Sequence, residues 1–325
     1  MALREFNFDA QSATSSYGKM LHSKVQKLMG NRFHLSVVSE NENWANEIIE
    51  SAIQEIIRIE QLLTTFNPDS QTNKINENAG IQPVTVDKEV YDLIQRSLRI
   101  SALTQGAFDI TYGSIDKSLW NFDTRMTTLP DPVTAKLMVK LIDYQKVILN
   151  QNDLSVFLQE TGMRIGFGGI GKGYAAEMAK RLMIKQGVEH GIVNASGDLA
   201  TWGNQPNGKP WTIGIADPNH KNQSFSYLDI SNMAVATSGN YEKFVMINGK
   251  RYSHTINPKT GLPVTGIKSV TIIAPNAEIA DALATPVTVM GVKVGLDLIN
   301  QMKGIACIIV DDFDKVFTSK NIKVT

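Results

Sequence analysis

The chain has 325 residues, of which 42% are hydrophobic, and its 32 Lys and Arg residues equal its 32 Asp and Glu residues. This content is sufficient for a large core, and the balanced charge argues against nucleic acid or an anionic membrane as a partner. The first 20 residues are polar, and no stretch reaches the ~18 apolar residues of a membrane span. We therefore expect a cytoplasmic protein without a signal peptide or membrane span, unless processing or engineering has altered the N-terminus. Cys307 is the single cysteine, which excludes internal disulfides and predicts a buried thiol.

The N-terminal part of the chain is expected to be a loosely held arm over residues 1–24, with the fold beginning near Lys24. Residues 32–39 alternate and are rich in β-formers, which predicts a strand. Apolar residues then recur at three- and four-residue spacing over 44–63, which is typical of a long amphipathic helix.

Capping signals predict two further helices before a hairpin. Asp87 is expected to cap the first of these helices, and Gly106 follows its end. Asp131 is expected to cap the second, over residues 133–141, with a proline in its first turn. Two short β-rich runs within 146–159 then predict a hairpin.

The second half of the chain is predicted to be mainly β-structure with one long helical region. The predicted strands are 191–194, 211–216, 227–230, 243–247 and 268–274, with a tight turn at Asn248-Gly249. Helical spacing follows over 277–302, but Pro286 interrupts it and is expected to kink or split the helix. A terminal hairpin should complete the fold.

A glycine-rich loop precedes another predicted helix and organises the middle of the chain. Its glycines, which are expected to take positive φ and to let the backbone approach a ligand closely, are Gly166, Gly168, Gly169, Gly171 and Gly173. Lys172 adds a positive charge, and the helix is predicted from Tyr174 to Gly187. The unpaired amides and dipole at its N-terminus favour an anion, most simply a phosphate or pyrophosphate.

Two familiar phosphate-binding motifs fit this loop only in part. Gly166-x-Gly168-x-x-Gly171 matches a dinucleotide fingerprint, but the next strand ends in Asn-Ala-Ser and lacks the acidic residue that the motif requires. A P-loop would need Ser or Thr where Gly173 stands. A turn that only packs against a sheet therefore remains an alternative.

Several separated stretches together resemble the FAD:protein FMN transferase (ApbE) family and occur in the family's order. They are Leu28-Met29-Gly30, residues 63–70 with Asn76, Gly106-Ala107-Phe108-Asp109, Lys172-Gly173-Tyr174-Ala175, Gly197-Asp198, and residues 236–239, 254–261 and 280–285. The resemblance implies one mixed α+β domain over residues 25–325, with largely antiparallel sheets and flanking helices. It also implies an enzyme that cleaves FAD at its pyrophosphate, attaches FMN to a Thr or Ser hydroxyl of an acceptor flavoprotein, releases AMP and uses Mg²⁺.

Asp281 and Thr285 are the candidate metal ligands. Their spacing puts a carboxylate and a hydroxyl on one helix face, and Mg²⁺ prefers such oxygen ligands. The resemblance adds the backbone carbonyl of Gly169. We expect Asp281 at the helix surface, where its loss would leave folding nearly intact; a capped or solvated helix start is the alternative for this pair.

His254 is the candidate general base, because imidazole titrates near neutral pH and the acceptor hydroxyl must lose a proton. A purely structural role is the alternative. The flavin contacts that the resemblance implies are Met29, Phe66, Ala107, Phe108, Asp109, Gly166, Lys172 and Ile256. Phe108 is equally suited to a core, and Asp109 to capping the next element.

The chain departs from the family pattern at four positions. Phe66 replaces a frequent Tyr, Gly166 a frequent Asp, Asn257 the Asp of His-x-Ile-Asp-Pro, and Ser196 a Gly. The missing carboxylate at Gly166 is expected to change contacts with the adenosine part of FAD. Two alternative functions therefore stay open, namely a non-catalytic FAD-binding or delivery protein and a magnesium-dependent FAD pyrophosphatase.

Overall fold

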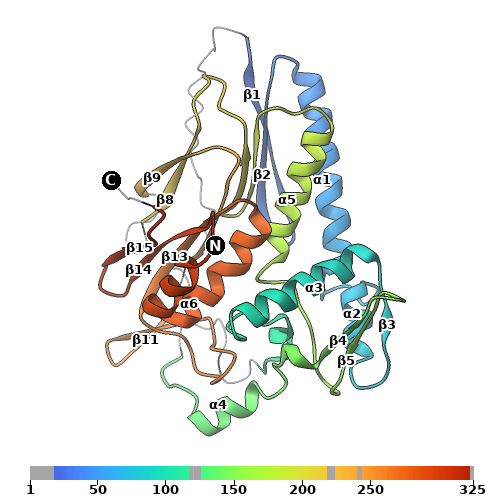
Figure 1. Cartoon of the computed structure of the whole chain (residues 1–325), viewed down its shortest axis with the longest axis vertical. Helices are drawn as coiled ribbons and strands as arrows, with labels where there is room; N and C mark the ends of the chain where they lie inside the picture. The colour runs from blue at the N-terminus through green and yellow to red at the C-terminus, as the bar shows by residue number, and fades with distance from the viewer. Residues whose placement is uncertain (1–17, 117–119, 121–125, 218–223, 240–243, 323–325) are drawn as a thin grey trace.

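The protein was analysed as a computed structural model that describes residues 18–116, 120, 126–217, 224–239 and 244–322. Its largest sheet has eight antiparallel strands (Figure 1). In spatial order they are β1 (Met20–Leu28), β2 (Asn31–Ser39), β6 (Gly191–Ala195), β7 (Asp198–Trp202), β10 (Ala234–Gly239), β13 (Ile267–Ala274), β14 (Ala306–Asp311) and β15 (Val316–Thr318). The predicted mixed α+β fold with largely antiparallel sheets is confirmed.

The sheet starts earlier in the chain than the sequence indicated. β1 begins at Met20, ahead of the predicted start near Lys24, and pairs along its whole length with β2. Met29 and Gly30 join the two strands in a tight turn with φ of 50° and 70°. Residues 1–17 of the predicted arm lie outside the described residues.

Three helices cover one face of this sheet: α1 (Glu42–Leu63), α5 (Gly171–Lys185) and α6 (Ala277–Asn300). The predicted apolar stripe of α1 is buried, and Asn41 accepts a hydrogen bond from the Trp44 amide at its N-terminus. Cys307 on β14 is buried as predicted, and this burial raises the pKa of its thiol to about 11.

The opposite face of the sheet is covered by the hairpin of β8 (Trp211–Ala216) and β9 (Ser224–Ile230). Successive side chains of β2 point to opposite faces of the sheet: Val37 belongs to the core under the helices, and Val38 belongs to the core under the hairpin. Central strands such as β7 and β13 are therefore buried on both faces, which explains their continuous apolar runs, whereas the edge strand β1 is largely exposed.

A second group of elements packs beside the ends of α1 and α6 (Figure 1). Its members are α2 (Gln71–Glu77), β3 (Val84–Thr85), α3 (Lys88–Leu103), the short helices η1 (Ile110–Ser114) and η2 (Tyr144–Lys146), α4 (Pro132–Met138), β4 (Val147–Asn150) and β5 (Ser155–Leu158). The β4–β5 hairpin and the Asp131 cap of α4 are confirmed. Asp87 precedes α3 as predicted, but its side chain accepts from Gln71 instead of capping the helix.

The break in α6 does not fall at Pro286. Pro286 stays within regular helix, and the single non-helical residue is Gly291, with φ 81° and ψ 171°. Glycine reaches this conformation without the steric cost that a side chain carries, so the chain bends there. α6 is long and apolar enough to cross a membrane by composition, but 44% of that window is buried. Its packing on β10 and β13 accounts for its apolar character.

A separate two-stranded hairpin consists of β11 (Phe244–Ile247) and β12 (Lys250–Ser253), joined by the predicted Asn248-Gly249 turn. Both turn residues have positive φ. Lys243, the first residue of the predicted strand, lies outside the described residues. β12 leads directly into the segment that carries His254.

Candidate functional site

A pocket of about 780 Å³ opens among the β1–β2 turn, the end of α1, η1, the glycine loop, the 254–258 segment and α6. Eleven of the twelve predicted site residues line it: Met29, Phe66, Ala107, Phe108, Asp109, Gly166, Gly169, Lys172, His254, Ile256 and Thr285. Asp281, the twelfth, contacts Lys172 beside the pocket. The volume lies within the usual range of ligand sites. Segments far apart in the sequence therefore contribute to a single cavity.

The glycine loop is held by hydrogen bonds from neighbouring elements rather than by unusual backbone angles. The Asn76 side chain bonds both the amide of Ile165, at 2.7 Å, and its carbonyl, at 3.1 Å. The Gly166 amide donates to the Ile110 carbonyl at 3.0 Å. None of the loop's five glycines has positive φ, so that expectation was wrong.

Close approach explains part of the glycine content. A Cβ on Gly166 or Gly168 would meet nothing within 4 Å, which leaves the backbone there open toward the pocket. The room at Gly166 also means that the Asp common in the family would fit this backbone. Gly173 is different, because a Cβ there would lie 2.6 Å from the Asp281 Cβ.

Helix α5 begins at Gly171, earlier than the predicted Tyr174, and ends before Gly187 as predicted. Lys172 and Gly173 therefore belong to its first turn. Because this turn lines the pocket, the positive end of the helix dipole faces the cavity. The Gly173 amide is already used, since it donates to Asp281 Oδ2 at 2.9 Å.

Lys172 forms ion pairs with two carboxylates. Its ammonium contacts Asp198, on β7, and lies 3.7 Å from Asp281 Oδ1. Burial opposes its charge, but the two carboxylates together raise the pKa of Lys172 above its usual value. For Asp198, burial raises the pKa of the carboxyl group, and the nearby charge of Lys172 offsets only part of this rise. The side chain of Lys172 stays 26% exposed, toward the pocket.

The donors around Asp281 suit a hard divalent cation, although the expectation of a helix-surface carboxylate was wrong. Asp281 is 6% exposed and is held by Gly173 and Lys172. Thr285, one turn further, and Gly169 both line the pocket. The described residues contain no group of three or more His, Cys, Asp or Glu suited to a metal. One carboxylate and neutral oxygens match Mg²⁺ that also binds substrate phosphates.

Asp109 caps η1, as its alternative interpretation predicted. Its Oδ1 accepts from the amide and hydroxyl of Thr111, and its Oδ2 accepts from the Tyr144 amide at 3.0 Å. Burial raises the pKa of Asp109 even though these hydrogen bonds favour the carboxylate. Phe108, immediately before it, belongs to the main core and also lines the pocket. Phe66 lies at the pocket surface and is 96% exposed.

His254 is partly buried in a loop that returns on itself beside η1. The Ile256 amide donates to the Tyr112 hydroxyl at 3.1 Å, and Ile256 bridges Pro263 across the loop. Asn257 Oδ1 accepts from the Lys259 amide at 2.9 Å. Asn257, which is uncharged, therefore forms an Asx turn at the position where the family pattern has Asp.

Three residues with a clear place in the site had no role assigned from sequence. Asp198 holds Lys172, Glu60 accepts from the Met29 amide at 2.8 Å, and Tyr112 supports Ile256. Asp198 was visible as part of a Gly-Asp motif, but its partner is distant in sequence. Glu60 and Tyr112 have no such local signal.

The ApbE family model matches residues 29–309. The chain belongs to the ApbE family. A FAD:protein FMN transferase of Klebsiella pneumoniae is 33% identical over 93% of this chain and 90% of its own length. One of Escherichia coli K12 is 31% identical over 82% of this chain and 77% of its own.

Solved ApbE structures show the same fold. The ApbE protein of Thermotoga maritima superimposes with a TM-score of 0.83 at 31% identity, covering 93% of this chain and 98% of that one. The flavinyl transferase ApbE of Pseudomonas stutzeri gives 0.82 at 24% identity, covering 94% and 96%. The predictions of an ApbE-family enzyme and of its fold are therefore confirmed.

Proposed function

We propose that this ApbE-family protein cleaves FAD and attaches FMN through a phosphoester to a Thr or Ser hydroxyl of an acceptor protein, releasing AMP. One observation carries the proposal: Lys172, at the start of α5, and His254 line the same pocket. The cavity thus combines a site for a pyrophosphate with a group that can accept a proton. Its relatives' names support flavin transfer.

Binding of the pyrophosphate follows from the start of α5. The helix dipole and the exposed face of Lys172 favour the anion, and the open backbone around Gly168 allows its close approach. The flavin ring would contact the apolar wall that Met29, Phe108 and Ile256 provide. These assignments carry over the flavin contacts predicted from sequence.

Mg²⁺ would be held by Asp281, Thr285 and the Gly169 carbonyl, and when bound it supplies positive charge to the pyrophosphate. Lys172 contacts the same Asp281 and so adds charge from the protein side. Asp198 keeps this ammonium in place from beneath. Lys172 would thus neutralise part of the charge on the leaving AMP.

His254 would act as the general base. The acceptor hydroxyl oxygen forms a bond to the FMN phosphorus, the bond from that phosphorus to the AMP oxygen breaks, and the hydroxyl proton passes to an imidazole nitrogen of His254. AMP leaves with its phosphate. Imidazole suits this role because its pKa lies near neutrality.

The products distinguish this proposal from a FAD-binding protein and from a FAD pyrophosphatase. The protein would be incubated with FAD, Mg²⁺ and a mixture of threonine-containing peptides, and the products followed by mass spectrometry and AMP chromatography. Transferase activity yields FMN-modified peptide and AMP in equal amounts. A pyrophosphatase would yield free FMN and AMP, and a binding protein would yield neither product.

The cytoplasmic location of the protein remains a prediction.

A further inference from the structure

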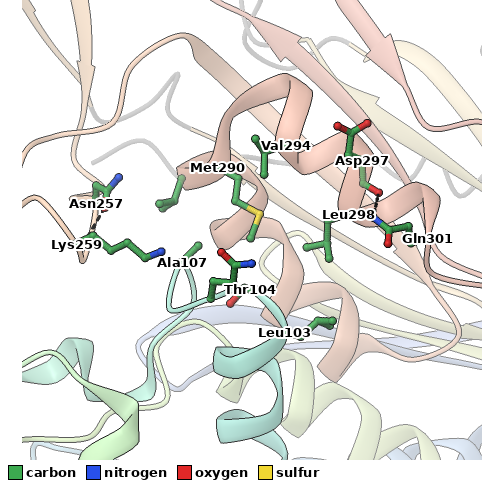
Figure 2. A pocket seen from close by; sticks show the side chains of 12 residues that line it. Leu103, Thr104, Ala107, Asn257, Lys259, Met290, Val294, Asp297, Leu298 and Gln301 are labelled. Atoms are coloured by element: carbon green, nitrogen blue, oxygen red, sulfur yellow. Dashed lines mark hydrogen bonds between the residues drawn. The ribbon is translucent and has the colours of Figure 1, made fainter.

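A second cavity, of about 330 Å³, lies between the C-terminal end of α3, residues 257–259 and the second half of α6 (Figure 2). We call it the α3–α6 pocket. The residues that define it are Leu103, Lys259, Met290, Val294, Asp297 and Leu298. The bend at Gly291 separates Met290 from the later helical residues of this wall.

The α3–α6 pocket adjoins the candidate site. Ala107 and Val289 line both cavities. The loop that carries His254 also continues into this pocket, through Asn257 and Lys259. A polypeptide whose hydroxyl residue meets His254 can therefore place neighbouring residues in the α3–α6 pocket without leaving the surface.

The chemistry of the pocket is amphipathic. Leu103 and Val294 are 47% and 56% exposed, so its apolar wall has room for further apolar contacts. Figure 2 shows the Lys259 side chain extending from its loop toward Ala107. Within the part of the chain that the structure describes, the Lys259 ammonium forms no ion pair, whereas the Lys259 carbonyl accepts a hydrogen bond from Lys136. The pocket thus offers one cation, Lys259, beside apolar surface, while its one carboxylate, Asp297, lies at the other end in Figure 2.

We propose that the α3–α6 pocket binds the acceptor polypeptide next to its Thr or Ser, taking one acidic side chain at Lys259 and one apolar side chain at Val294. The inference rests on the proposed flavin transfer. The volume is at the small end of ligand sites, so it suits a few side chains of a longer chain, while the larger cavity takes FAD. Complementary charge at such a position selects between partners.

The test is the sequence preference of flavin transfer. The protein, FAD and Mg²⁺ would be incubated with synthetic peptides that have a central threonine and randomised flanking positions, and the modified peptides would be sequenced by mass spectrometry. Wild type should enrich acidic over basic residues at one flanking position. Lys259→Glu should shift that ratio at least about fivefold toward basic residues, because attraction becomes repulsion. Val294→Asp should remove an apolar preference.

Matched controls are Lys293→Glu and Ile184→Asp, which change exposed residues outside both pockets. These variants should keep the wild-type preferences, and all four should bind FAD with the wild-type affinity. The same preferences in wild type and Lys259→Glu would overturn the inference. A tenfold loss of FAD affinity in Lys259→Glu would overturn it too, since the pocket would then belong to FAD. If wild type modifies no peptide and releases no AMP, the proposed function itself fails, and the inference with it.

Discussion

The amide of Gly173 donates to Asp281 Oδ2 at 2.9 Å, and this hydrogen bond joins the first turn of α5 to α6. The two helices approach so closely that a Cβ on Gly173 would lie 2.6 Å from the Asp281 Cβ and closer still to the Ala277 carbonyl. The contact places Lys172 of one helix beside Asp281 of the other. The charges of the candidate site thus depend on a packing contact that only glycine allows.

Gly173→Ala is expected to destabilise the protein by about 2 to 4 kcal/mol, because the added methyl group must push α6 away or strain its backbone. Gly168→Ala is the matched control. A Cβ at that position meets nothing within 4 Å, so its unfolding free energy should change by less than about 1 kcal/mol. Urea denaturation of both variants measures the difference. Equal midpoints would contradict the tight contact.

Asp281→Asn separates the charge of this residue from its role in packing. Asn keeps an oxygen for the Gly173 amide, whereas Asp281→Ala leaves that buried amide unpaired and should cost about 1 to 3 kcal/mol of stability. Both variants should lose Mg²⁺-dependent release of AMP from FAD. A Mg²⁺ titration of AMP release checks the metal assignment. Normal release by Asp281→Asn at low Mg²⁺ would show that the carboxylate holds no metal.

Lys172→Met should both destabilise the protein and weaken FAD binding, since it leaves Asp198 and Asp281 without the cation between them. The double variant Lys172→Met/Asp198→Asn removes one of these two unpaired charges and should recover part of the stability. FAD affinity should remain about ten- to a hundredfold weaker in both, because the lost contact to the anion is charge-assisted. Calorimetric titration with FAD measures this. Restored affinity in the double variant would mean that Lys172 is structural only.

The sequence predicted best what depends on local pattern. The stripe of α1, the Asp131 cap and the Asn248-Gly249 turn each follow from neighbouring residues, and each is confirmed. The motifs also identified the residues that line one pocket, although they did not give the contacts among them.

What the sequence could not supply was long-range packing. Asp281 looked like a surface residue because helix spacing does not show that Gly173 lies against it. Asp198 is the ion-pair partner of Lys172 only because β7 runs beneath the start of α5. The bend of α6 occurs at Gly291, where glycine allows a non-helical conformation, and not at Pro286, where the rule that proline breaks helices placed it.

Asp109→Asn gives a pH-dependent prediction for the loop that carries Phe108. The variant places an amide where both carboxylate oxygens accept hydrogen bonds, so it should be less stable than wild type by about 1 to 3 kcal/mol. Burial raises the pKa of Asp109 above its ordinary 3.8, so folded wild type holds this proton to higher pH than the unfolded chain does. Wild type therefore loses stability as pH rises above 3.8, and the variant lacks this loss.

The difference in unfolding free energy between wild type and Asp109→Asn, which we call the deficit, should accordingly shrink between pH 4 and pH 7. Urea denaturation of both proteins across this range measures it, and the contributions of other carboxylates largely cancel in the difference. A deficit that grows with pH would mean that the pKa of Asp109 is lowered in the folded protein. The hydrogen bonds from Thr111 and Tyr144 would then outweigh burial.

His254→Asn tests whether the pocket performs transfer or only binds FAD. If His254 takes the proton from the acceptor hydroxyl, the variant should lower FMN transfer by ~10²- to 10⁴-fold, the usual range for loss of a general base. FAD affinity should stay near the wild-type value, because the proposed pyrophosphate site is at the start of α5 and does not include His254. His22→Asn, on β1 and outside the pocket, is the matched control and should transfer normally.

The pH profile gives the same test independently of folding. The wild-type rate should fall toward acidic pH as imidazole becomes protonated and can no longer accept the proton. The residual rate of His254→Asn should lack this acidic limb, since asparagine does not titrate there. Single-turnover transfer to a threonine peptide with saturating FAD, measured from pH 5 to pH 8, gives both profiles. Equal rates for the two proteins across that range would assign His254 a structural role, and the proton would then need another acceptor in the pocket.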